Sequence, residues 1–298
     1  MDLSSRFAGT RLRDYYTEVT WRRTMNFAAA VDDPNPFYMD DEREGGIIAP
    51  PVFGVAVTWP IVERIWDYLE SDDFPMDVMM TQVHHTEDLE FHRPIRPGDP
   101  LTVKGEIAAI LPHRAGTRVV VRFDAVNREG EAVFTEHIGA LLRGVRCSDD
   151  GRSPSPIPET PSFQEGSRSL WESPIFVDPL RPHVYDGCTD IVFPIHTSRS
   201  FARQVGLPGT ILQGTATLAF AAREIVNREG EGNPSTLRRL SCRFTGMVLP
   251  GTTIRVQLLG KGEGQDGTDL HFHVLNQEGG KAISGGYALM THARVESV

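Results

Sequence analysis

The feature that most constrains this chain is an internal repeat, because the same order of sequence features occurs twice. Each copy has a short polar segment with a proline, a long apolar segment typical of a buried helix, a Pro-Gly pair, and then segments of alternating β-branched residues. The Pro-Gly pairs at 97–98 and 250–251 lie 153 positions apart, and Pro36 and Pro194 of the polar segments lie 158 positions apart. Two copies of one folding unit, differing by small insertions, explain this spacing better than two unrelated domains.

Each copy predicts one helix followed by a run of antiparallel strands, which is an α+β unit. The apolar segment 207–226 leaves little polar face for water, so we expect its helix to be surrounded by a curved sheet. Segments such as 117–127 and 253–262 alternate between polar and apolar residues, as antiparallel strands do. Because edge strands need partners, we expect the two copies to pair through one continuous sheet.

A segment rich in Ser, Pro, Gly, Asp and Glu, residues 147–168, predicts a linker that crosses the surface. The expected division is an N-terminal repeat of residues 1–146, this linker, and a C-terminal repeat of residues 169–298. A chain of 298 residues is long enough for two such units, each with its own core.

Composition and charge exclude some classes of partner. The formal net charge of −10 argues against nucleic acid, since proteins that bind it concentrate Lys and Arg on one face. No apolar run of about 18 residues is present, so we expect no membrane partner. The first residues lack the apolar stretch of a secretory signal, and the three cysteines lie far apart without metal-ligand spacing. We therefore expect a cytoplasmic protein with free thiols and no metal site.

The second copy resembles the MaoC-like dehydratase family, which includes the (R)-specific enoyl-CoA hydratases of the hydratase 2 type. Residues 194–196 (Pro-Ile-His) are similar to the end of its first motif, residues 201–202 (Phe-Ala) to a pair that follows, and Gly214 to the glycine at the helix entry. The 18 positions from His196 to Gly214 match the spacing of that signature. The resemblance covers nearly the whole chain outside the linker. It implies a double hotdog fold, in which each repeat wraps a long antiparallel sheet around a central apolar helix.

The resemblance also implies a reaction, the reversible hydration of a trans-2-enoyl thioester to an (R)-3-hydroxyacyl thioester in the C-terminal repeat. Asp190 and His196 would activate the water, since carboxylate and imidazole are the usual proton-transfer groups. The backbone N–H of Gly214, at the positive end of a helix dipole, would stabilise the enolate oxygen of the thioester. The implied partner is an acyl-CoA or acyl-carrier-protein thioester, no cofactor is implied, and a homodimer of such chains is a further expectation.

Some positions depart from the family pattern. The aspartate position of the family falls on Ile191, so Asp190 is catalytic only if the loop carries a one-residue bulge. Gln213 stands where the family usually has histidine. The first copy keeps the Asp-x-Asn-Pro spacing around Asn35 but has Tyr38 at the histidine position, which implies a non-catalytic half that houses the acyl chain.

Substrate contacts are expected from five side chains. Tyr38, Asn35 and Gln213 occupy motif positions, and Arg199 and Arg203 would reach the phosphates of a CoA or carrier-protein arm. For the two arginines, a solvated surface position is the simpler alternative.

The catalytic residues also have simpler explanations when each is taken alone. His196 then becomes a loop histidine bonded to a backbone carbonyl, Asp190 a turn or helix-cap residue, and Gly214 a turn before a helix. Two other functions stay open: a non-catalytic acyl-thioester binding protein, and a thioesterase, because hotdog folds carry both chemistries. Convergence of Asp190 and His196 on one water favours catalysis, and their separation favours binding.

Overall fold

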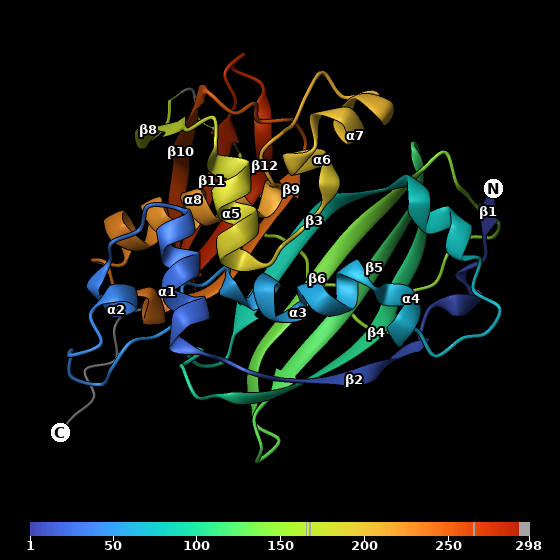
Figure 1. Ribbon diagram of the computed structural model, residues 1–298, viewed down its shortest axis with the longest axis horizontal. Helices are drawn as coiled ribbons and strands as arrows, with labels where there is room; N and C mark the ends of the chain where they lie inside the picture. The colour runs from blue at the N-terminus through green and yellow to red at the C-terminus, as the bar shows by residue number, and fades with distance from the viewer. Residues whose placement is uncertain (165, 167, 265, 292–298) are drawn as a thin grey trace.

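The computed structural model describes residues 1–164, 166, 168–264 and 266–291, and Figure 1 shows its elements. Over these residues, ten strands form one antiparallel sheet in the order β2-β4-β5-β6-β3-β9-β12-β11-β10-β8. The first five strands belong to the N-terminal copy and the last five to the C-terminal copy, and the pair β3–β9 joins them. The strand order of one copy mirrors that of the other. The predicted α+β fold of two repeats sharing one sheet is therefore confirmed.

The strands of the two copies correspond in length and order. In the N-terminal copy they are β2 (Arg11–Glu18), β3 (Gln82–Phe91), β4 (Pro100–His113), β5 (Gly116–Val126) and β6 (Ala132–Arg143). In the C-terminal copy they are β8 (Trp171–Val177), β9 (Leu237–Phe244), β10 (Thr252–Glu263), β11 (Thr268–Leu275) and β12 (Lys281–Met290). A separate parallel pair joins β1 (Asp2–Leu3) to β7 (Arg146–Cys147).

The repeated Pro-Gly pairs make the same turn in both copies. Gly98 has φ +89° and Gly251 has φ +81°, a backbone region that favours glycine. The N–H of Gly98 donates to the carbonyl of Val19 at 2.7 Å, and the N–H of Gly251 donates to the carbonyl of Val177 at 2.7 Å. This shared hydrogen bond shows that the spacing in the sequence reflects one repeated structure.

Each copy packs a long apolar helix against the inner face of the sheet (Figure 1). In the C-terminal copy this helix is α8 (Gly214–Glu229), whose alanines and large apolar side chains are buried as expected. Its counterpart α3 (Phe53–Glu63) is equally apolar, but Pro60 interrupts it and a short helix α4 (Ile65–Tyr68) follows. The N-terminal helix α1 (Trp21–Ala30) packs against α5 (Arg181–Thr189), its equivalent in the second copy.

Short helices carry the two polar motifs. Motif residues of the first copy form α2 (Pro36–Met39), and those of the second form α6 (Pro194–Thr197), which α7 (Arg199–Gln204) follows. Three 3-10 turns complete the described elements, at Ser5–Phe7, Met76–Thr81 and Pro234–Thr236. Across the described part of the chain, no helix combines the length and the apolar character that crossing a membrane requires.

The connection between the copies lies against the outer face of the sheet. Arg239 donates to the carbonyl of Glu159 at 3.0 Å, and the hydroxyls of Thr160 and Ser241 lie 3.2 Å apart. The ring of Phe163 stacks on His271 at a centroid distance of 4.5 Å. The connecting segment therefore has fixed contacts with the second copy.

Candidate functional site

His196 is tied to the turn that leads into α8. Its Nδ1 lies 2.9 Å from the backbone carbonyl oxygen of Ile211. A carbonyl oxygen only accepts, so Nδ1 carries the hydrogen and Nε2 keeps a lone pair. Burial lowers the pKa of His196 to about 4, against the opposing effect of this hydrogen bond. At neutral pH the imidazole is uncharged and its Nε2 is able to accept a proton.

The N-terminus of α8 offers unpaired backbone N–H groups close in sequence to that histidine. Helix α8 begins at Gly214, and its N-cap residue Gln213 makes no side-chain capping bond. The first N–H groups of a helix lack partners within the helix, and they lie at the positive end of its dipole. Gln213 instead donates from Nε2 to the carbonyl of Pro182 at 3.0 Å, while its Oε1 is buried without a hydrogen-bond partner. The turn can therefore receive an electron-rich oxygen of a ligand.

Side chains from both copies meet beside Gly214. A Cβ atom at Gly214 would lie 3.0 Å from the ring of Phe244 on β9. That ring contacts His84 on β3 edge-to-face at a centroid distance of 4.6 Å. Because β3 belongs to the N-terminal copy, the helix entry of one copy is lined by a histidine of the other.

Behind His84 lies a buried pair of carboxyl groups. Glu87 of β3 and Glu136 of β6 are 1% and 0% exposed. The Nε2 atom of His84 lies 3.1 Å from an oxygen of Glu87. Burial raises the pKa of Glu87 to about 8, and burial together with the nearby Glu87 raises the pKa of Glu136 well above its usual range. Because the two carboxyl groups are buried near each other, both hold protons at neutral pH. The pair therefore stores protons beside the site.

Asp190 occupies a different environment from His196. It ends α5 with a left-handed backbone, φ +58°, and its N–H donates to the carbonyl of Asp186 at 3.0 Å. The side chain is exposed, whereas the next residue, Ile191, is 2% exposed. Within the described part of the chain, no hydrogen bond or ion pair joins Asp190 to His196. The one-residue offset seen in the sequence thus places the side chain of Asp190 on the protein surface and that of Ile191 in the protein interior.

The first motif is held by structural contacts. Asn35 accepts from the N–H of Phe37 at 2.9 Å, and its amide donates to Asn227 at 3.1 Å and to the carbonyl of Gly232 at 2.7 Å. Tyr38 is 1% exposed, and burial raises the pKa of its hydroxyl. These bonds fasten the N-terminal motif to the C-terminal end of α8. Contact of Asn35 and Tyr38 with substrate stays a prediction.

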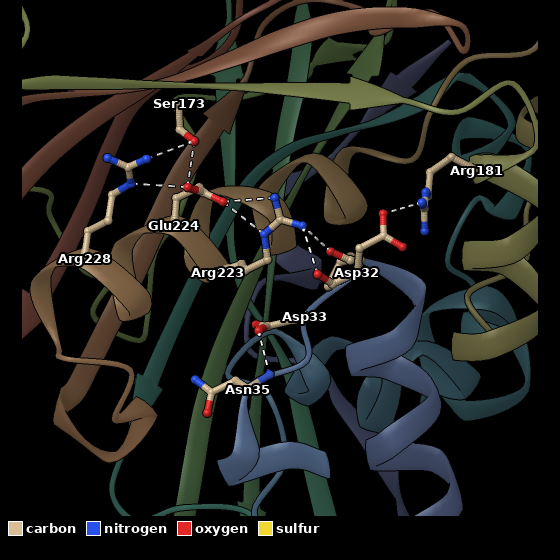
Figure 2. Close-up of polar contacts among 9 residues, drawn as sticks. Asp32, Asp33, Asn35, Ser173, Arg181, Arg223, Glu224 and Arg228 are labelled. Atoms are coloured by element: carbon tan, nitrogen blue, oxygen red, sulfur yellow. Dashed lines mark hydrogen bonds and ion pairs between the residues drawn. The ribbon is translucent and has the colours of Figure 1, made fainter.

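An ionic network also fastens this loop to the second copy, as Figure 2 shows. Arg181 forms an ion pair with Asp32 and donates to the carbonyl of Ala30 at 2.8 Å. Arg223 of α8 donates to the carbonyl of Val31 at 2.6 Å and pairs with Glu224 at 2.9 Å. Both arginines come from the C-terminal copy and their backbone acceptors from the N-terminal copy, so the network fixes the two motifs relative to each other.

Arg199 and Arg203 of α7 lie exposed on the surface near His196. Among the described residues neither forms an ion pair. Apolar rings accompany them, since Phe193 lies 6.3 Å from Phe201 and 6.4 Å from the His196 ring, measured between centroids. A role for the two arginines in binding phosphate stays a prediction.

Sequence reasoning missed the carboxyl pair. A signal was present, because Glu136 shares its strand face with Phe134 and Ile138, both buried, and a charged residue on an apolar strand face is unusual. His84 carries no such signal in the sequence. Its position beside Phe244 depends on the pairing of β3 with β9, which no local pattern reveals.

Comparisons with known proteins agree with the two-copy organisation. Residues 181–278 match the MaoC-like domain family, and residues 6–136 match the FAS1-like dehydratase domain region. Peroxisomal multifunctional enzyme type 2 of Drosophila melanogaster is 35% identical over 268 residues, which are 88% of this chain and 43% of that enzyme. Peroxisomal enoyl-CoA hydratase 2 of Arabidopsis thaliana is 25% identical over 185 residues, 59% of each chain. This chain spans less than two thirds of either relative.

A solved structure shows the same fold. The MaoC-like dehydratase from Phytophthora capsici superposes with a TM-score of 0.81 at 19% identity, covering 95% of this chain and 96% of that one. The double hotdog architecture expected from the sequence is thereby confirmed.

Proposed function

We propose that this chain, which belongs to the MaoC-like dehydratase family, adds water reversibly to trans-2-enoyl thioesters and forms (R)-3-hydroxyacyl thioesters. Two relatives support a hydro-lyase, one named multifunctional enzyme type 2 and one named enoyl-CoA hydratase 2. The observation that carries the proposal is the hydrogen bond from His196 to Ile211. It joins a neutral imidazole to the turn that opens α8.

In the proposed reaction, Nε2 of His196 removes a proton from water while the water oxygen bonds to C3 of the enoyl group. The C2=C3 electron pair moves toward the thioester and creates an enolate. The proton held on Nε2 of His196 then moves to C2, which restores the neutral imidazole, so one water is added and no other reactant is consumed. A neutral imidazole whose other nitrogen is fixed by a carbonyl suits this role, because its basic nitrogen is always available.

The enolate oxygen would meet the N-terminus of α8. The N–H groups at Gly214 and the residues after it would donate to this oxygen as its charge develops. Gly214 lacks a side chain, and this lets the ring of Phe244 pack directly against the start of the helix. Removing one such donor from an enzyme typically raises the barrier by about 3 kcal/mol.

We propose Asp190 as the carboxylate that shares the water with His196. Its side chain is exposed, so this pairing requires the loop after α5 to bring Asp190 inward when substrate binds. The buried pair of Glu87 and His84 is the competing source of a carboxyl group. Turnover that survives Asp190→Asn but is lost in Glu87→Gln would assign the role to Glu87.

A second candidate function is binding of an acyl thioester without turnover. The exposed position of Asp190, with Ile191 at the aspartate position of the family, favours it. Under that alternative, His196 and the α8 N-terminus would hold the thioester carbonyl but leave the double bond intact.

The test is the loss of enoyl-thioester absorbance when purified protein meets crotonyl-CoA or a longer-chain enoyl-CoA, with chiral analysis of the product. The proposal expects turnover to the (R)-3-hydroxy product. Tight binding of an enoyl-CoA without any absorbance change would establish the binding protein instead. Release of free CoA thiol would identify a thioesterase.

A further inference from the structure

The outer face of the sheet carries a large hollow, whose lining includes Glu87 of the carboxyl pair described above. Its volume is about 840 Å³, within the range of small-molecule sites. Ser241 and Arg243 line it, and they alternate along β9 with the core residues Leu240 and Cys242. The hollow therefore opens on the sheet face opposite the helices.

The connecting segment between the two copies forms one wall of this hollow. Residues 157–163 line it, and Ile157 packs on the outer-face residues Val120 and Leu111. The bonds to Glu159 and Thr160 and the Phe163–His271 stack hold this wall against the sheet. One wall of the hollow is thus a fixed part of the fold.

Cationic side chains gather at one end. Arg118 and Arg243 line the hollow, and both lie close enough to His85 to lower the pKa of its imidazole, after the larger effect of burial. His113 lies beside them, with its ring centroid 5.7 Å from that of His85. These four groups come from β3, β4, β5 and β9, so strand pairing brings them together in a chain whose net charge is −10.

The arginines of this cluster lack counter-charges. In the part of the chain that the structure describes, neither Arg118 nor Arg243 belongs to an ion pair. The Nε–H of Arg118 is buried without an acceptor. The Nδ1 atom of His85 is likewise buried without a hydrogen-bond partner. Three acidic residues also line the hollow: Asp88, which is already bound to Arg239 at 2.7 Å, the buried Glu87, and Glu159. A buried N–H without an acceptor, such as the Nε–H of Arg118, costs free energy, and an anion with several oxygens would relieve that cost.

We propose that this hollow binds a phosphate-bearing anion, held by Arg118 and Arg243 with His85 and His113 beside them. The planar guanidinium group of arginine donates two parallel hydrogen bonds that match a pair of phosphate oxygens. Two sources share this chemistry: the nucleotide end of a CoA thioester, and a separate small phosphate compound. The inference stands apart from the hydration reaction, because binding is measurable without turnover.

The binding test is calorimetric titration of the full chain with sodium diphosphate and with adenosine 3′,5′-bisphosphate. Each of Arg118→Gln and Arg243→Gln should weaken binding at least about tenfold, the effect of losing one charge-assisted contact. Arg13→Gln is the matched control, since Arg13 is exposed on the distant edge strand β2 and its change alters the net charge equally. Absence of binding to the unaltered protein, or equal binding by all three variants, overturns the proposal.

A kinetic arm distinguishes the two sources. If the CoA nucleotide occupies the hollow, Arg243→Gln raises the KM for an enoyl-CoA but leaves the KM for the phosphate-free N-acetylcysteamine thioester unchanged. If diphosphate binding is lost while both KM values stay constant, the occupant is a separate phosphate compound. Failure of the hydratase proposal shows as no turnover in any variant and leaves the calorimetric result intact.

Discussion

The imidazole of His84 lies 3.1 Å from the carboxyl group of Glu87, and both groups are uncharged near neutral pH. Burial lowers the pKa of His84 to about 4, and its hydrogen bond to the backbone of Thr86 opposes that shift. Burial raises the pKa of Glu87 to about 8. The contact therefore brings together a neutral imidazole and a protonated carboxyl group. The stability of this contact therefore depends on pH in a different way from that of an ion pair.

Glu87 makes a contribution to stability that falls as the pH rises. The folded pKa of Glu87 is about 8 and the ordinary value is 4.5, so the folded state binds more protons between these values. The contribution is complete below pH 4.5 and is lost as the pH rises through 8. Its size is on the order of 4 kcal/mol. Glu87→Gln, which stays neutral, should flatten this fall in the free energy of unfolding, measured by urea denaturation at pH 5 and pH 8.

Glu90→Gln is a suitable control, because Glu90 lies on the same strand but is exposed. It should leave the pH dependence of stability as in the unaltered protein. A Glu87→Gln variant that loses stability between pH 5 and pH 8 as steeply as the unaltered protein would show that Glu87 is ionised throughout.

Gly214→Ala should lower activity while the fold is kept. The added methyl group would lie 3.0 Å from the ring of Phe244, so that ring must shift toward His84. A displacement at this point of the site should reduce kcat/KM by about 10²-fold. Steady-state kinetics with an enoyl-CoA measures it.

Gly209→Ala provides the matched comparison, since a Cβ there meets nothing within 4 Å. Its kcat/KM should stay near that of the unaltered protein. If Gly214→Ala is equally active, the close packing of Phe244 against Gly214 does not contribute to catalysis.

Arg181→Ala should destabilise the junction between the copies. The substitution removes the bond to the carbonyl of Ala30 and the ion pair with Asp32, and it leaves a buried acceptor without a donor. We expect the free energy of unfolding to fall by about 2 kcal/mol. Arg13→Ala, on an exposed strand position, should change it by less than about 0.5 kcal/mol. Equal urea midpoints for the two variants would contradict the importance of this network.

The repeat and the central helices were predictable from the sequence because they rest on local patterns. The Pro-Gly pairs mark one turn conformation twice, and the apolar run around Phe220 predicts a helix buried on all sides. Pairing of the copies through one sheet followed from the need to satisfy strand edges, whereas the choice of β3 and β9 as the joining strands did not.

The site was predictable only in part. His196 and Gly214 were found because their spacing matches a signature, and the structure connects them through the turn at Ile211. The exposure of Asp190 depends on how α5 ends, which one residue of offset decides. The contact of His84 with Phe244 depends on pairing between strands more than 150 positions apart, which a local pattern does not specify.

The most direct test of the central claim is the rate of crotonyl-CoA hydration by His196→Ala beside the unaltered protein, with circular dichroism to confirm that both are folded. We predict a fall in kcat of about 10²- to 10⁴-fold, the usual contribution of a proton-transfer group. The activity of the unaltered protein should decline only as the pH falls toward about 4, where His196 gains a proton. A folded His196→Ala variant that hydrates crotonyl-CoA at the unaltered rate would contradict the account.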